Sequence, residues 1–260
     1  MTSPYEAALE TIKLRNHHIS LLIWAEGGRI LEVKSLESGA DLVSWWPYML
    51  GHPEGVGGIG ERSIELGASP YRCRRDDDAL ILTRCLLGGL TLVKTITLPA
   101  DSMSFGVSIK VSNDSGKTRS FVIDQTAAVC PGFGGACPRE ASGISHCHEK
   151  AFLKRPSGQT ETVYYEVFEK LRVERDDLEW AAFVDPVSHN MLSAILPEGH
   201  CVLRTNYHWW LDWSRELTLD PHERFSADFY FTVTGHVDIC LLYTSPSPRD
   251  RTRSRMPSSA

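Results

Sequence analysis

The segment Arg204–Trp213 (RTNYHWWLDW) holds the densest set of side chains able to bind or transform a ligand. Interpreted as one strand, it sends successive side chains to opposite faces. The odd-numbered face is typical of a core, whereas the even-numbered face presents polar groups and one indole: Arg204, Asn206, His208, Trp210 and Asp212. Planar donors and acceptors beside an aromatic ring suit the hydroxyls and the C–H face of a sugar. The alternative is a solvated outer face.

Trp46, next to Trp45 at the start of a long Gly- and Pro-rich loop, is a further candidate for contact with a ligand. Two neighbouring residues of a strand cannot face the same side, so at most one of this pair lines a pocket.

His146 and His148 share one side of an extended segment close to three cysteines. Because no paired CxxC spacing accompanies them, the sequence predicts no metal site.

The stretch Gly55–Gly60 formally matches the GxGxxG pattern of dinucleotide-binding proteins. A dinucleotide site needs a strand before the glycines and a helix after them, because the phosphates meet the helix N-terminus. His52-Pro53 precedes this stretch and Pro70 soon follows, so no helix fits. We therefore expect no cofactor.

Composition and charge restrict the function further. The 260 residues are 42% hydrophobic with a net charge of −6, which predicts a globular chain with a sizeable core and argues against nucleic acid or an anionic membrane as the main partner. No run approaches the roughly 18 apolar residues of a membrane span, and the N-terminus lacks a signal-peptide pattern. We expect a cytoplasmic protein with reduced cysteines and a small, neutral partner; the oligomeric state stays open.

Strand signals dominate the chain from Leu14 onward, and only Pro4–Thr11 has a helical pattern. A meander of four antiparallel strands is predicted over Ala79–Leu87, Leu90–Leu98, Ser104–Ser112 and Arg119–Val129, with turn residues between them. Later strands are expected at Thr162–Arg172, Leu178–Val184, Met191–Leu196, Cys201–Trp213, Arg215–Leu219 and Arg224–Thr234. These elements predict an all-β fold, a single large antiparallel β-sandwich.

Three motifs resemble galactose mutarotase-like proteins, the β-supersandwich group that includes aldose 1-epimerases. Gly27–Ile30 followed by Gly39–Val43 is similar to the opening hairpin, Leu90–Asn113 to the central meander, and Leu217–Thr234 to a closing hairpin with a Pro-x-Glu turn. The resemblance implies a supersandwich with a sugar on its concave sheet.

The resemblance also implies roles for single residues. Mutarotation needs an acid and a base on opposite sides of the anomeric centre. Glu223, in the Pro-x-Glu turn, corresponds to the base, and Arg62 lies where the epimerases place a substrate-contacting arginine. Gln125 stands about where the acid histidine is expected, yet glutamine cannot transfer a proton near neutral pH. His146 or His148 would then have to act as the acid.

Three functions follow from these residues. The first is a carbohydrate-binding protein that holds a sugar or short glycan on the concave sheet. The second is an active aldose 1-epimerase-type isomerase, with Glu223 as base and a loop histidine as acid. The third is an accessory or structural domain without a ligand.

The last 21 residues do not resemble the rest of the chain. Cys240–Asp250 (CLLYTSPSPRD) looks like one reading frame of a transposase adapter from sequencing libraries, and Ser254–Ala260 looks like the adjoining flow-cell adapter. The sequence therefore predicts a galactose mutarotase-like domain over residues 1–239 and a disordered, adapter-derived tail over 240–260. Without the four arginines and one aspartate of this tail, the net charge becomes −9. A natural Ser/Pro/Arg-rich tail is the alternative.

If the tail was never selected to pack, truncation after Asp238 should leave the melting temperature and the circular dichroism spectrum unchanged. The prolines and arginines of this segment disfavour an ordered element. Truncation after Asp228, inside the last predicted strand, is the control and should unfold the protein. Loss of folding after the Asp238 truncation would identify the tail as part of the domain.

Overall fold

The computed structural model describes residues 10–43, 58–61, 70–131, 149–165, 172–176, 178–205 and 209–234, with the backbone alone described for 172–176. Strands, turns and bends make up these segments, and no helix occurs among them. Thr11, expected at the end of a helix, opens strand β1 instead; residues 4–9 of that prediction lie outside the described ranges.

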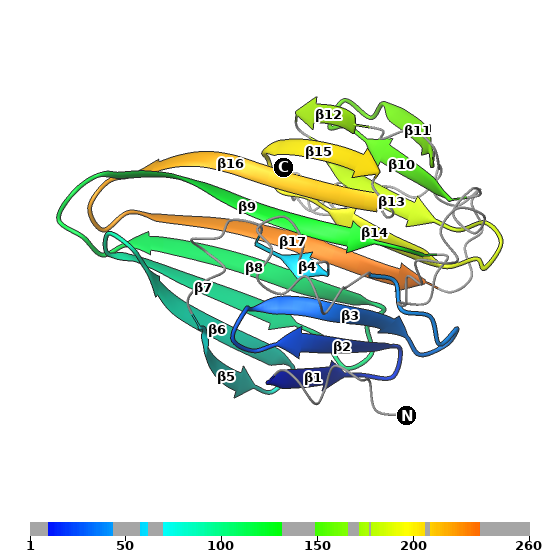
Figure 1. The fold of residues 1–260 in the computed structure, drawn as a ribbon, viewed down its shortest axis with the longest axis horizontal. Coiled ribbons are helices and arrows are strands. Elements are labelled where there is room, and N and C mark those ends of the chain that lie inside the picture. Colours follow the sequence, from blue (N-terminus) through cyan, green and yellow to red (C-terminus); the bar gives the residue numbers. More distant parts are fainter. Residues whose placement is uncertain are drawn as a thin grey trace, which may run out of the picture.

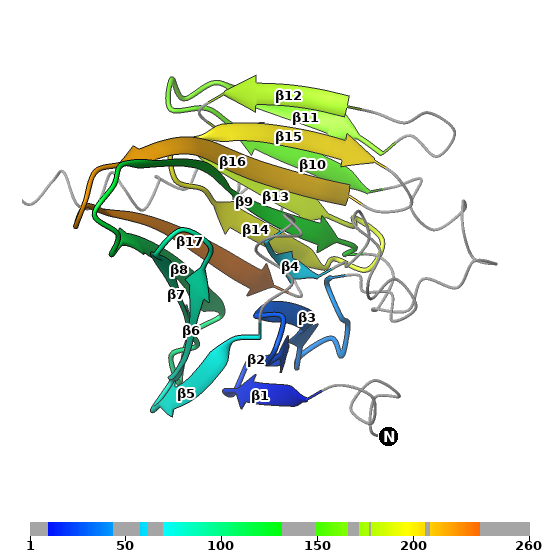
Figure 2. The ribbon, with the colours of Figure 1, turned by 60° about the vertical axis from the view of Figure 1, so that its left-hand side comes forward.

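Two antiparallel sheets form the sandwich (Figures 1 and 2). In spatial order the first sheet contains β1 (Thr11–Arg15), β2 (Ile19–Trp24), β3 (Arg29–Ser35), β4 (Ile59–Gly60), β9 (Arg119–Val129), β16 (Trp209–Leu219), β15 (His200–Thr205) and β12 (Arg172–Asp176). The second contains β11 (Thr160–Tyr164), β10 (Lys150–Lys154), β13 (Trp180–Val184), β14 (Met191–Ile195), β17 (Arg224–Thr234), β8 (Ser104–Asn113), β7 (Leu90–Thr97), β6 (Ala79–Leu86) and β5 (Arg72–Asp76). The prediction of an all-β antiparallel sandwich is confirmed.

The predicted meander is confirmed for three strands and wrong for the fourth. β6, β7 and β8 are consecutive neighbours, but β9 lies in the first sheet, and β8 pairs with β17 instead. The chain changes sheet after Asn113, a fully buried residue. The Asn113 side-chain nitrogen donates to the carbonyls of Lys117 and Leu219, both at 2.9 Å. One amide thereby ties the β8–β9 corner to the β16–β17 corner.

The segment interpreted as one strand, Cys201–Trp213, is divided between two strands. β15 ends at Thr205, β16 begins at Trp209, and the two pair side by side as antiparallel neighbours. Arg215–Leu219, predicted as a separate strand, continues β16.

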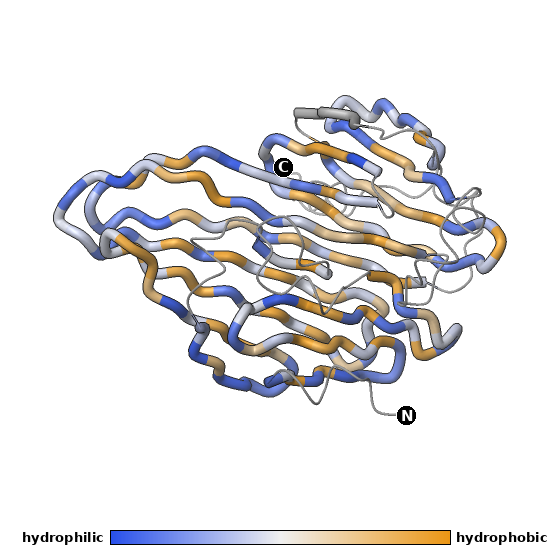
Figure 3. The backbone as a smooth tube through the Cα atoms, viewed as in Figure 1, coloured by the Kyte–Doolittle hydropathy of each residue, from blue (hydrophilic) through white to orange (hydrophobic). Residues whose placement is uncertain are grey.

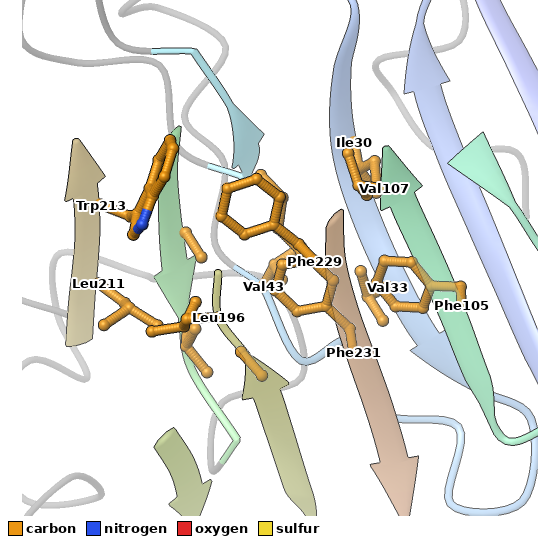
Figure 4. Close-up of a cluster of buried hydrophobic side chains, with 14 of the residues drawn as sticks. Ile30, Val33, Val43, Phe105, Val107, Leu196, Leu211, Trp213, Phe229 and Phe231 are labelled. Carbon is orange, nitrogen blue, oxygen red and sulfur yellow. The ribbon is translucent and has the colours of Figure 1, made fainter. Parts of the chain in front are cut away.

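Apolar side chains from both sheets meet in the interior. Hydropathy alternates along the strands, as period-two geometry requires (Figure 3). In Figure 4, Trp213 of the first sheet lies beside Phe229 of the second, edge to face with 5.0 Å between ring centroids. Phe105 and Phe231 stack at 5.0 Å within the second sheet. The contact between Trp213 and Phe229 joins the two layers into one core.

A buried ion pair also links the sheets. Lys94 occupies an inward position of β7, and its Nζ lies 2.5 Å from Oε1 of Glu61, which follows β4; both side chains are at most 2% exposed. Burial by itself would raise the pKa of Glu61. The positive charge and the hydrogen bond of Lys94 lower it, and the pKa of this carboxyl lies below its usual range. Burial lowers the pKa of Lys94.

The turn between β2 and β3 supplies a second acceptor for Lys94. Its Nζ donates to the Gly28 carbonyl at 2.8 Å. Gly28 has a φ of +62°, and a Cβ there would lie 2.4 Å from the Tyr71 ring. Glycine is therefore required for this backbone conformation and this close approach. The Arg84 guanidinium covers the same Tyr71 ring at 4.7 Å from its centroid.

Replacing Glu61 by Gln should destabilise the protein by about 3–5 kcal/mol, because Lys94 would remain buried without its anion. The double variant Glu61→Gln/Lys94→Met should recover part of that loss. Glu198→Gln is the matched control, since Glu198 forms a solvent-exposed pair with Arg215 and should cost only about 0–1 kcal/mol. Urea denaturation measures all three, and equal losses at Glu61 and Glu198 would contradict the assignment.

Candidate functional site

Three predicted site residues lie together on the outer face of the first sheet. Antiparallel pairing places Arg204 of β15 opposite Trp210 of β16, and Asp212 follows on the same face. The Arg204 Nε donates to Asp212 Oδ2 at 2.6 Å, and its guanidinium lies 4.8 Å from the Trp210 ring centroid. The face predicted for these three residues is therefore correct, although two strands provide it rather than one. We call them the Arg204–Asp212–Trp210 cluster.

Strand β9 extends this cluster from the other side of β16. Thr126 lies opposite Asp212 and donates its hydroxyl to Asp212 Oδ1 at 2.5 Å. Both Asp212 oxygens therefore accept a hydrogen bond, which fixes the plane of the carboxylate. Asp124 pairs with Ser214 and lies two residues from Thr126 on the same outer face.

Arg29, a residue that the sequence analysis did not single out, adds a second guanidinium. It is 6% exposed and donates to the Glu61 carbonyl. Burial lowers the pKa of Arg29 to about 10, against the opposing influence of Glu61, Asp124 and Asp212. Gly60 makes room for it, because a Cβ there would lie 2.7 Å from Arg29 Cγ. The Gly27–Ile30 motif contained this residue but predicted only a hairpin.

The cluster offers groups for binding hydroxyls. Nη2 of Arg204 is buried and finds no hydrogen-bond partner within the part of the chain that the structure describes. A buried donor of this kind costs free energy unless something accepts its hydrogen bond. Asp212 provides acceptor oxygens beside it, and Trp210 provides an aromatic surface. Among the described ranges, no group of three or more His, Cys, Asp or Glu residues is placed to hold a metal.

Gln125 does not join these residues. It lies opposite Trp213, so its side chain is on the inward face of β9, where it borders a narrow space with Trp213 and Phe229. Its Nε2 donates to the adjacent Asp124 carbonyl at 2.8 Å. Because residues 125 and 126 point to opposite faces, a side chain at position 125 meets the core while Thr126 meets Asp212.

Glu223 also lies apart from the cluster. It occupies the exposed turn between β16 and β17, and its carboxylate accepts from the Asp220 backbone N–H at 2.8 Å. From Asp212 the strand continues to Leu219, which at about 3.3 Å per residue is roughly 23 Å. The predicted base is thus at the far end of β16 (Figure 1) and stabilises a turn there.

The remaining predicted residues, Trp46, Arg62, His146, His148, Asn206 and His208, lie outside the described residues. Described sequence neighbours of Arg62, Asn206 and His208 lie beside Arg29 or residues of the cluster. Glu61 precedes Arg62, and its carbonyl accepts from Arg29. Thr205 and Trp209, which flank residues 206–208, pair directly beside Arg204 and Trp210.

Comparison with known proteins supports the fold. No protein-family model and no curated protein sequence matches the chain. Among solved structures, the Slr1438 protein of Synechocystis sp. PCC 6803 has a TM-score of 0.67 at 13% identity, with 88% of this chain and 96% of that chain covered. A galactose mutarotase-like protein of Lactobacillus casei has a TM-score of 0.62 at 10% identity, with coverage of 86% and 100%.

A putative aldose 1-epimerase of Escherichia coli K12 has a TM-score of 0.62 at 11% identity, with coverage of 86% and 99%. The chain therefore has the galactose mutarotase-like fold that its motifs predict. At these identities the likeness concerns the architecture. None of the described segments forms a helix long and apolar enough to cross a membrane.

The two adjacent tryptophans should respond differently to truncation. Trp209 is fully buried, donates to Glu149 at 2.9 Å and meets Tyr165 edge to face. Trp209→Ala should cost about 3–5 kcal/mol of unfolding free energy. Trp210→Ala removes the cation–π contact with Arg204 on the outer face and should cost less, about 0.5–1 kcal/mol. Urea denaturation decides this, and a reversed order would mean that the inward face of β16 is wrongly assigned.

Proposed function

We propose that this protein binds a neutral sugar, a monosaccharide or the end of a short glycan, on the outer face of the first sheet. The Arg204–Asp212–Trp210 cluster carries the proposal. Asp212 and Arg204 fix each other at 2.6 Å and leave the buried Nη2 of Arg204 without an acceptor among the described residues. A sugar hydroxyl matches this donor, and the Trp210 ring suits the C–H face of a pyranose.

The charges at the cluster favour a neutral ligand. Arg204 and Asp212 compensate each other, and the charges of Asp124 and Asp212 favour the charged form of the buried Arg29. An anionic ligand would meet these two carboxylates, and a cationic one would meet the two guanidiniums. The galactose mutarotase-like fold adds support, because a structure of this fold is named as a putative aldose 1-epimerase.

The alternative is an aldose 1-epimerase-type isomerase. In that reaction a base takes the proton of the anomeric hydroxyl while an acid protonates the ring oxygen, the bond between C1 and the ring oxygen breaks, and closure on the other face reverses these steps. Glu223 lies at the opposite end of β16 from the cluster, whereas Asp212 is the carboxylate within it. Asp212 is therefore the stronger candidate base, with His146 and His148 as candidate acids.

Calorimetric titration with galactose and with glucose tests the binding proposal. Wild-type protein should bind at least one of them, and Trp210→Ala and Asp212→Asn should each weaken binding at least tenfold, about 1.4 kcal/mol. Glu223→Gln should bind as wild type does. Absence of binding to either sugar would favour the accessory domain without a ligand.

Polarimetry separates binding from catalysis in the same variants. A binding protein should leave the equilibration rate of α- and β-galactose unchanged. An accelerated rate lost in Asp212→Asn but kept in Glu223→Gln would establish the isomerase with Asp212 as base. Loss in Glu223→Gln alone would restore Glu223 to the mechanism and contradict the site as assigned.

A further inference from the structure

A groove of about 370 Å³ lies on the outer face of the second sheet, away from the Arg204–Asp212–Trp210 cluster. Its walls come from β7, β8 and β17 together with the connection between β7 and β8, and include Thr97, Ser104, Gly106, Ser108, Asp228 and Tyr230. This volume falls within the range of about 300–1,000 Å³ that is common for small-molecule sites.

Tyr230 forms an aromatic surface at the centre of this groove. It pairs with Gly106, and a Cβ at Gly106 would lie 3.7 Å from ring atoms Cδ1 and Cε1 of Tyr230. The ring therefore lies over the glycine backbone instead of projecting into solvent. It nevertheless remains 52% exposed. An aromatic ring held against the sheet, with its outer side open, is suited to stacking with little loss of side-chain freedom.

Short hydroxyl side chains surround this ring. Alternation along β8 sends Ser104 and Ser108 to the same side as Gly106, and Thr97 of β7 pairs with Gly106 from the other direction. Ser104 exchanges a hydrogen bond of 2.7 Å with Thr232. These side chains are short, so they leave space on both sides of the Tyr230 ring, and their hydroxyls offer hydrogen-bond donors and acceptors beside it.

The charges of the groove restrict its ligand. Asp228 pairs with Ser108 and provides the one charged side chain among the lining residues. Among the described residues that line the groove there is no lysine or arginine, so an anionic ligand would gain no charge partner from them and would face the carboxylate of Asp228. A neutral ligand with hydroxyls around apolar faces fits the hydroxyls, the carboxylate and the ring together.

The row of side chains through Tyr230 continues toward β13. Tyr230 pairs with Ile195 of β14, and Ile195 pairs with Trp180 of β13. Since strands are spaced at about 4.8 Å, the second aromatic position lies roughly 10 Å from the first. Trp180 is partly exposed. Two aromatic positions in one row across the strands favour a chain of sugar units over a single ring.

We propose that this groove, centred on Tyr230, binds a neutral oligosaccharide chain independently of the first-sheet site. Native affinity electrophoresis through gels containing soluble starch or xyloglucan tests it. Wild-type protein should be retarded by at least one of these polymers. Tyr230→Ala should lose that retardation, with at least a tenfold weaker affinity, whereas Tyr230→Phe should keep it.

Tyr164→Ala is the matched control, because Tyr164 is a similarly exposed tyrosine, 60% accessible, on the edge strand β11. It should be retarded as wild type is, and thermal melts should show that all these variants are folded. Trp210→Ala should also be retarded normally, so failure of the first-sheet site leaves this result unchanged. Absence of wild-type retardation by both polymers, or equal retardation of Tyr230→Ala, would overturn the proposal.

Discussion

The ion pair between Lys94 and Glu61 couples the interior of the sandwich to the cluster on its outer face. Lys94 takes an inward position on β7, where the alternation of that strand would otherwise place an apolar residue. Glu61 directs its carboxylate to Lys94, while its backbone carbonyl accepts from Arg29. One residue thus takes part in the buried ion pair and in a hydrogen bond to Arg29, and the charges of Asp124 and Asp212 act on the pKa of Arg29.

Period-two alternation explains which parts of the fold were predictable. β7 and β8 alternate strictly between buried and more exposed residues, β17 does so from Ala227 onward, and their signals in the sequence are correspondingly clear. Long-range pairing leaves no such signal. β9 looks like the next strand of the meander, yet it pairs with β16 and β4 in the first sheet, and at the corner before it Asn113 donates to the carbonyl of Leu219, 106 positions later. Sequence neighbours give no indication of that contact.

The same limit applies to the candidate site. Arg204, Trp210 and Asp212 were predicted to share one face of a single strand. They share a face in the structure too, although β15 and β16 are separate strands, because directly paired residues of antiparallel strands point to the same side of the sheet. Thr126 and Arg29 come from distant strands, and each contributes a polar atom that only the assembled sheet brings near Asp212. Glu223 lies apart from these residues, and its carboxylate accepts a hydrogen bond from the backbone of its own turn.

The two outer faces of the sandwich differ in the physical basis of recognition. On the first sheet, guanidinium and carboxylate groups hold one another in largely buried positions, so a ligand would meet directional donors and acceptors whose orientation is already fixed. On the second sheet, an exposed ring over a glycine lies among short hydroxyl side chains. The first arrangement favours discrimination among hydroxyl configurations, because a misplaced hydroxyl leaves a buried group unpaired. The second would accept many sugars, because stacking depends on a flat apolar face more than on the position of any one hydroxyl.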